Sequence, residues 1–146
     1  MKFRFKNKKF AINVGFPKNS KIVLDVTNSL LVDGTINALD LEIKSFDSTF
    51  NINGLSKTSL RLILTKSFFN DNDNGIVREF RVIKDVHVDF YKSKAYLQCG
   101  DITGGVELDG KCKKGSFLGI NCHYVNNVNN NIACDNNSRV SIKTIN

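Results

Sequence analysis

The sequence lacks tryptophan, and among its 146 residues it has only one proline, one methionine and two histidines. Neither His87 nor His123 lies in a recognisable general-base or metal-ligand pattern. Phosphate-binding P-loops, G-x-S-x-G elbows and H-E-x-x-H motifs are also missing. We therefore expect a protein that is not an enzyme and that uses no cofactor or metal ion.

Long apolar runs are missing as well, since none approaches the roughly 18 residues needed to cross a bilayer. The basic stretch 2–9 is followed by a short segment, 10–16, that contains Asn13 and therefore fails as the apolar part of a secretion signal. These features predict no membrane span and a cytoplasmic location. The length suits a single domain covering residues 1–146.

Four cysteines fall in the last third of the chain, at positions 99, 112, 122 and 134. The lack of a secretion signal favours free, reduced thiols, although an even count leaves disulfides open. A zinc site is disfavoured because the gaps are wide. Cys122 and His123 are neighbours, but adjacent residues of a strand point to opposite faces.

Apolar residues alternate with polar ones along most of the chain, and this period of two predicts β-strands. Two clear examples are 60–64, with three leucines, and 86–90, with Val86, Val88 and Phe90. Segments 29–41 and 56–69 also allow a helix. We favour strands for both and leave one short helix open.

Asn-Gly and Asp-Gly pairs separate these runs, and such pairs favour tight β-hairpins. They occur at Asp33-Gly34, Asn53-Gly54, Asn74-Gly75 and Asp109-Gly110. The sequence therefore predicts a mainly β protein, either an antiparallel sandwich or barrel-like domain or a β-coil. The polar stretch 70–75 is predicted to be a loop. Its acidic and amide oxygens could also bind calcium, but their spacing does not fit an EF-hand.

From about residue 96 the chain becomes rich in glycine, with steps of roughly five residues. Residues 97–119 contain Gly-Asp-Ile-Thr-Gly-Gly-Val followed by further glycine steps. This segment resembles the repeats of bactofilins and related polymer-forming β-helix proteins. The resemblance implies a few stacked β-coils and self-assembly.

The formal net charge is +7, and the first nine residues carry five cations and no acid. A basic surface attracts anions, and cations interleaved with tyrosines suit phosphate contact and base stacking. We therefore expect a binding protein for an anionic small molecule, such as a nucleotide, or for nucleic acid. The candidate contact residues are Arg78, Arg81, Tyr91, Lys92, Lys94, Tyr96, Lys111, Lys113 and Lys114.

Two other classes of function remain open. One is a self-assembling structural β-protein, and the other is a small inhibitor of another protein, of the kind that viruses and mobile elements encode. Many short strands leave sheet edges that must be covered, so we also expect a homo-oligomer.

Overall fold

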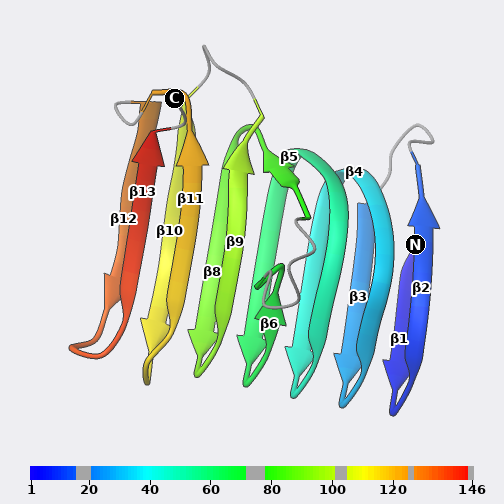
Figure 1. Ribbon diagram of the computed structural model, residues 1–146. Helices are drawn as coiled ribbons and strands as arrows, with labels where there is room; N and C mark the ends of the chain where they lie inside the picture. The colour runs from blue at the N-terminus through cyan, green and yellow to red at the C-terminus, as the bar shows by residue number, and fades with distance from the viewer. Residues whose placement is uncertain (16–20, 72–77, 101–104, 125–126, 145–146) are drawn as a thin grey trace.

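The structure, a computed structural model, describes residues 1–15, 21–71, 78–100, 105–124 and 127–144. About 76% of the described residues lie in strands, and every strand pair among them is parallel. The chain winds into a β-solenoid of about six turns, in which successive turns stack side by side from the N-terminus to the C-terminus (Figure 1).

Thirteen strands follow one another in the described part of the chain. They are β1 (Lys2–Lys6), β2 (Lys9–Val14), β3 (Lys21–Thr27), β4 (Leu30–Phe46), β5 (Thr49–Thr65), β6 (Phe68–Phe69), β7 (Phe80–Val82), β8 (Asp85–Tyr91), β9 (Lys94–Cys99), β10 (Val106–Lys113), β11 (Phe117–Cys122), β12 (Val128–Cys134) and β13 (Arg139–Thr144).

The strands form two layers. Layer 1 holds β1, β3, the second halves of β4 and β5, β8, β10 and β12; layer 2 holds β2, the first halves of β4 and β5, β6, β7, β9, β11 and β13. The two longest strands, β4 and β5, run through both layers. The first half of β4 pairs with β2, for example, and its second half pairs with β3.

The core lies between the two layers and is built by the period-two alternation. Leu24, Ile43, Leu62 and Val88 are register neighbours on successive turns of layer 1, and each is fully buried. Such columns remove apolar surface from water, which is the main force that stabilises a fold. The alternation predicted for 60–64 and 86–90 is confirmed.

The prediction of an antiparallel sandwich or barrel is wrong, because three of the expected hairpins lie inside strands. Gly34 lies in β4, Gly54 in β5 and Gly110 in β10. A Cβ on Gly54 would lie 1.9 Å from the carbonyl oxygen of Ile36, one turn earlier. These glycines therefore allow stacked turns to approach closely instead of reversing the chain. The fourth expected hairpin, at Asn74-Gly75, and most of the predicted loop 70–75 lie outside the described residues.

The strands predicted for 29–41 and 56–69 are confirmed, since the two segments lie largely in β4 and β5. Tertiary stacking thus outweighs the helical spacing of leucines in the second segment. The described residues contain no helix that is long and apolar enough to cross a bilayer.

Candidate anion-binding interface

The chain passes from layer 1 to layer 2 through a series of tight corners, which together form one edge of the solenoid. We call this edge, made of residues 7–8, 28–29, 47–48, 66–67, 92–93, 114–116 and 135–138, the corner edge. The first residue of six corners adopts a left-handed backbone, with φ between 47° and 58°. Those six residues are Asn7, Asn28, Asp47, Lys66, Lys92 and Lys114.

A column of serines fixes the inner side of these corners. The backbone N–H of Ser48 donates to Oγ of Ser67 (3.2 Å), and the N–H of Ser67 donates to Oγ of Ser93 (3.0 Å). Each of these hydroxyls donates in turn to the carbonyl oxygen two residues earlier, as from Ser67 to Thr65 (2.9 Å). The column consists of Ser29, Ser48, Ser67, Ser93, Ser116 and Ser138.

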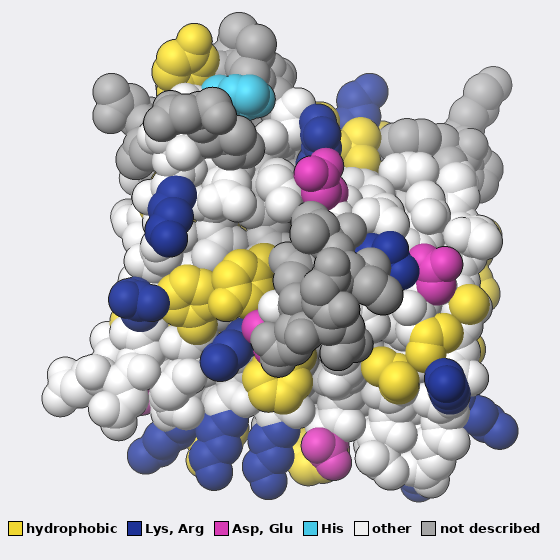
Figure 2. All heavy atoms as spheres, viewed as in Figure 1, with side chains coloured by type: hydrophobic (Ala, Val, Ile, Leu, Met, Phe, Trp, Pro, Cys, Tyr) yellow, Lys and Arg dark blue, Asp and Glu magenta, His cyan; other side chains and the backbone are white. Residues whose placement is uncertain are grey.

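The left-handed first residue of each of these six corners is exposed to solvent. On three successive turns this residue is a lysine: Lys66, Lys92 and Lys114. All three are exposed, and none forms an ion pair with an acid of the described chain. Neighbouring turns are about 4.8 Å apart, so the three lysines span about 10 Å. Figure 2 shows basic side chains in a row along the lower edge, with one acidic side chain next to them.

Aromatic rings lie beside two of these lysines. Nζ of Lys66 lies 5.8 Å from the ring centroid of Phe46, and Nζ of Lys92 lies 5.6 Å from that of Tyr91. The two rings are exposed at 48% and 39%. The cations are therefore held near ring faces and still reach solvent.

A second group of rings lies on the outer face of layer 2. The ring centroids of Tyr96 and Phe117 are 5.4 Å apart, and the guanidinium carbon of Arg139 lies 5.0 Å from that of Phe117. Gly119 makes room for both rings, since a Cβ there would lie 2.9 Å from Tyr96 and 3.0 Å from Phe117. Lys94 precedes Phe117 in the same register column.

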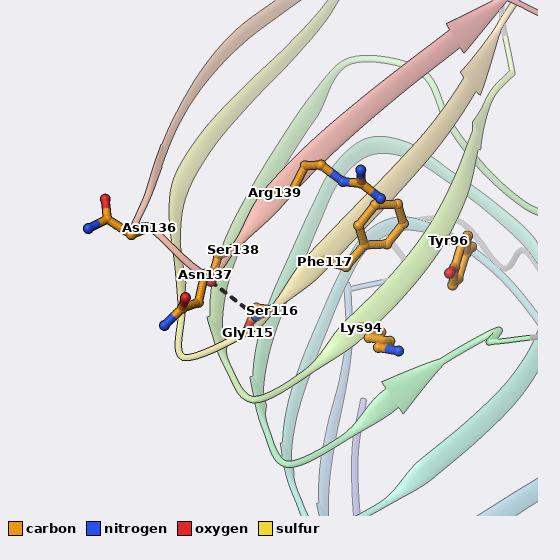
Figure 3. A pocket seen from close by; sticks show the side chains of 9 residues that line it. All are labelled: Lys94, Tyr96, Gly115, Ser116, Phe117, Asn136, Asn137, Ser138 and Arg139. Carbon is orange, nitrogen blue, oxygen red and sulfur yellow. Dashed lines mark hydrogen bonds between the residues drawn. The ribbon is translucent and has the colours of Figure 1, made fainter.

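These side chains line a shallow hollow of about 520 Å³, which we call the ring hollow (Figure 3). Its other walls are corner residues, namely Gly115, Ser116, Asn136, Asn137 and Ser138. The hollow therefore opens beside the corner edge, directly after Lys114. A ligand at the corner lysines and a ligand in the ring hollow would be neighbours.

Acids bound the lysine row at both ends. Asp47 occupies the corner before Lys66. At the other end, Asp135 accepts a hydrogen bond from the backbone N–H of Lys114 (2.7 Å). That bond, helped by one from Ser138, holds the pKa of the Asp135 carboxyl below its usual range, so it stays charged. Between these two acids the first residue of each corner is a lysine, and the first corner of the edge adds Lys8.

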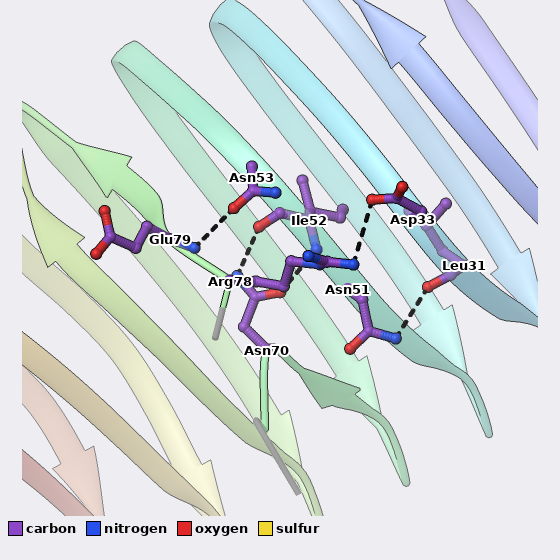
Figure 4. Close-up of polar contacts among 8 residues, drawn as sticks. All are labelled: Leu31, Asp33, Asn51, Ile52, Asn53, Asn70, Arg78 and Glu79. Atoms are coloured by element: carbon purple, nitrogen blue, oxygen red, sulfur yellow. Dashed lines mark hydrogen bonds and ion pairs between the residues drawn. The ribbon is translucent and has the colours of Figure 1, made fainter. Parts of the chain in front are cut away.

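Two predicted contact residues lie away from this edge. Arg78 pairs with Asp33 (3.4 Å), and its side chain is only 19% exposed. Next to it, the buried Asn70 side chain accepts from the N–H and donates to the carbonyl of Ile52, both at 2.8 Å (Figure 4). Arg78 therefore helps to hold the chain against layer 2. Arg81, on β7, forms an ion pair with Glu79, in which Nη2 of Arg81 lies 3.3 Å from Oε2 of Glu79.

The other predicted residues gather at or near the corner edge. Lys92 and Lys114 belong to the lysine row, and Lys94 and Tyr96 line the ring hollow. Tyr91 and Lys113 end β8 and β10 at the corners and are register partners, while Lys111 lies two residues further from the edge. Their role in binding remains a prediction.

Sequence reasoning missed Lys66, Phe117 and Arg139. A signal was present, because the corner serines recur at intervals of 19, 19, 26, 23 and 22 residues. Aligning the chain on these serines would have placed Lys66 and Lys92 in one column, with Lys114 one residue further from its serine. No short motif marks Phe117 or Arg139, which join the hollow only through the stacking of β9, β11 and β13.

In the described residues no group of three or more histidines, cysteines or acids is arranged to hold a metal ion. The resemblance of residues 97–119 to bactofilins remains an expectation, because the solenoid alone does not identify a family. Comparisons with family models, with curated proteins and with solved structures found no match.

Proposed function

We propose that this protein is a non-enzymatic binding module for single-stranded nucleic acid, held along the corner edge. The observation that carries the proposal is the row of three exposed lysines on successive turns, Lys66, Lys92 and Lys114, with aromatic rings beside it. Evenly spaced cations suit an anionic polymer better than a compact anion, which would contact only one or two of them.

The rings favour nucleic acid among anionic polymers. In the ring hollow, Tyr96 and Phe117 lie beside Lys94, so a base could stack while a neighbouring phosphate meets the cation. Stacking on an aromatic side chain contributes about 1–3 kcal/mol per base and tolerates any sequence. A duplex keeps its bases stacked inside, so the proposal specifies a single strand.

The test is binding of a fluorescent oligothymidylate, followed by anisotropy at several salt concentrations. The edge variant carries Lys66→Asn, Lys92→Asn and Lys114→Asn, because asparagine is already the corner residue at Asn7 and Asn28 and tolerates the left-handed backbone. Losing three phosphate contacts on a single strand should reduce the slope of log affinity against log salt by about 2.

A matched control removes the same charge from elsewhere. Lys21, Lys57 and Lys84 are exposed and lie at the opposite edge of the solenoid, where the layer 1 strands begin or resume. Changing these three to glutamine should alter the salt slope much less. Equal losses in both variants would mean that net charge alone attracts the strand, and the proposed interface would be wrong.

Phe117→Leu separates base stacking from charge. The leucine keeps an apolar side chain but removes the ring, so affinity for oligothymidylate should fall about tenfold, in line with the loss of one stacked base. Affinity for inorganic polyphosphate should not change. Equal affinity of wild type and variant for both polymers would contradict the use of the ring hollow.

We keep self-assembly as a second candidate function because of the two end turns. Among the described residues, β1 pairs only with β3 and β2 only with β4, and β12 and β13 likewise have one partner each. Phe3, Phe5 and Phe10 of the first turn are only partly buried. Strand edges of this kind can pair with another copy.

Sedimentation velocity over a wide range of protein concentration tests the second candidate. Stacked solenoids would give large species whose size grows with concentration and resists salt. A single small species at every concentration would exclude self-assembly of this chain and leave the nucleic-acid proposal untouched.

A further inference from the structure

The four cysteines, which are far apart in the sequence, form two neighbouring pairs in the solenoid. Cys112 on β10 and Cys134 on β12 are direct register partners. Cys99 and Cys122 come one residue after the register pair Gln98 and Asn121, at the ends of β9 and β11. In both pairs one cysteine lies close enough to raise the pKa of its neighbour. Every cysteine of the chain thus has another cysteine on the adjacent turn.

This arrangement approaches the geometry of a disulfide. Neighbouring strands lie about 4.8 Å apart, which is inside the Cα separation that a disulfide spans, about 4.4–6.8 Å. In-register parallel partners direct their Cβ atoms to the same side, so the sulfurs face one another across the gap. The usual Cβ separation is about 3.5–4.5 Å, so the strands must move slightly closer. Such strain makes a disulfide easier to reduce.

The four thiols differ in access. Cys99, Cys112 and Cys122 are buried, with exposures of 6%, 0% and 2%, whereas Cys134 is exposed. Burial, reinforced by the neighbouring cysteine, raises the pKa of both Cys99 and Cys112 to about 12. Because the thiolate is the nucleophile, Cys134 is the thiol that reacts first.

We propose that Cys112–Cys134 and Cys99–Cys122 are two reversible disulfide sites that clasp the last turns of the solenoid in the presence of a small-molecule disulfide. The Cys134 thiolate attacks the oxidant, which forms a mixed disulfide and releases one small thiol. The Cys112 sulfur, after losing its proton, attacks Sγ of Cys134 and expels the second small thiol. Two cysteine thiols are oxidised, and one small disulfide is reduced to two thiols.

The second pair follows the same chemistry more slowly, because both of its thiols are buried and the end of β11 must open before the oxidant can enter. The finished bridges would tie β10 to β12 in layer 1 and β9 to β11 in layer 2. Both layers of the final turns would then be fastened. End turns of a solenoid contact neighbours on one side only, so they are where such ties have most effect.

The experiment incubates the full chain with excess oxidised glutathione, blocks the remaining thiols with an alkylating agent and measures the intact mass. Each bridge removes two hydrogen atoms, about 2 Da, and leaves two cysteines without an alkyl group, whereas a trapped mixed disulfide adds one glutathione. We expect one bridge at early times and two at late times. Proteolytic peptides should assign the first to Cys112–Cys134 and the second to Cys99–Cys122.

Hydrogen exchange measures what the bridges do. Oxidised protein should exchange amide hydrogens of β10 and β12 at least tenfold more slowly than reduced protein, with little change in β3 and β4. The melting temperature should rise by about 5 °C, and dithiothreitol should reverse both effects.

A Cys134→Ser variant is the matched control, because the position is exposed and the substitution should not affect folding. Its late product should contain only the Cys99–Cys122 bridge. The proposal is overturned if wild-type protein stops at the mixed disulfide, or if Cys99 pairs with Cys112. It is also overturned if cysteines of different molecules pair instead. None of these outcomes depends on nucleic-acid binding.

Discussion

The middle turns of the solenoid and its last turns share one backbone arrangement but differ in what they place inside and outside. In the middle, the inward positions hold large apolar side chains such as Leu41, Ile43, Leu62 and Leu64. In the last turns, the corresponding layer 1 positions include Gly110 and Cys112, and layer 2 contributes further small residues, among them Ala95, Cys99 and Cys122.

On the outer surface, in contrast, the last turns carry the larger and more reactive side chains, namely the lysines of the corner edge and the aromatic rings of the ring hollow. The first three corners present asparagine, asparagine and aspartate, whereas the next three present lysine. The ring hollow lies entirely on β9, β11, β13 and the corners that precede the last two. Since each turn of a solenoid contacts only its neighbours, stability and binding can be placed in different turns of one fold. We expect the middle turns to supply most of the stability.

The largest effect is expected for Gly54→Ala, in the middle of the solenoid. The added Cβ would lie 1.9 Å from the backbone oxygen of Ile36, and φ of +146° is strained for alanine. Turns must separate, so the free energy of unfolding should fall by about 4 kcal/mol or more in urea titrations. Gly15→Ala, where nothing lies within 4 Å, is the control and should change it little.

Gly110→Ala sharpens this comparison, because its Cβ would lie 1.8 Å from the carbonyl oxygen of Val88. The clash is equally severe but lies near the end of the solenoid. Hydrogen exchange should therefore show lost protection in β10 and β12, while β3 and β4 remain protected. Global unfolding by this substitution would mean that the last turns are not separable from the middle.

Truncation of inward side chains gives the next largest effect. Leu62→Ala should reduce the free energy of unfolding by about 3 kcal/mol, because Leu62 is fully buried and a cavity would remain. Cys112→Ala removes only a sulfur and should cost about 1 kcal/mol. The measurement is urea denaturation under reducing conditions. Equal losses in the free energy of unfolding would show that the two regions do not differ in stability.

The serine column should show a smaller difference. Ser67→Ala leaves the N–H of Ser48 without its acceptor at a buried site and should cost about 2 kcal/mol. Ser138→Ala affects the last corner, where the hydrogen bond from the N–H of Ser116 is only partly buried, so its cost should be about 0.5–1 kcal/mol. The measurement is thermal melting of the two variants. Equal losses of stability would show that the serine column contributes uniformly along the solenoid.

The smallest effect on stability is expected at the lysines themselves. Lys66→Asn should change the free energy of unfolding by no more than about 0.5 kcal/mol, because the side chain is exposed and asparagine suits the left-handed corner. A large loss of stability would show that Lys66 supports the fold and would weaken its assignment to binding.

Much of the fold could be predicted from local pattern. The leucines of 60–64 and the apolar residues of 86–90 alternate, and they are buried as that alternation requires. In β1 the charged Lys2, Arg4 and Lys6 follow the same alternation and are exposed. Alternation depends only on which way successive side chains point along a strand, which is a local property.

The direction of pairing could not be predicted in this way, because parallel and antiparallel strands share the same period of two. Gly54 and Gly110 each follow a residue that is typical of a hairpin turn. In the structure, however, each glycine allows its backbone to lie close to the preceding turn of the solenoid. Only the distant partner, Ile36 or Val88, explains why glycine is required there.

The candidate site divides in the same way. Tyr96 and Lys94 were recognisable as residue types that suit an anionic ligand, and the cysteines were countable. The register of the stacked turns decided the rest. It brings Phe117 and Arg139 to Tyr96, aligns lysines from three turns, and places Cys99 against Cys122. Register depends on the length of each turn summed over distant segments, so residues about 20 apart become neighbours only when the solenoid closes.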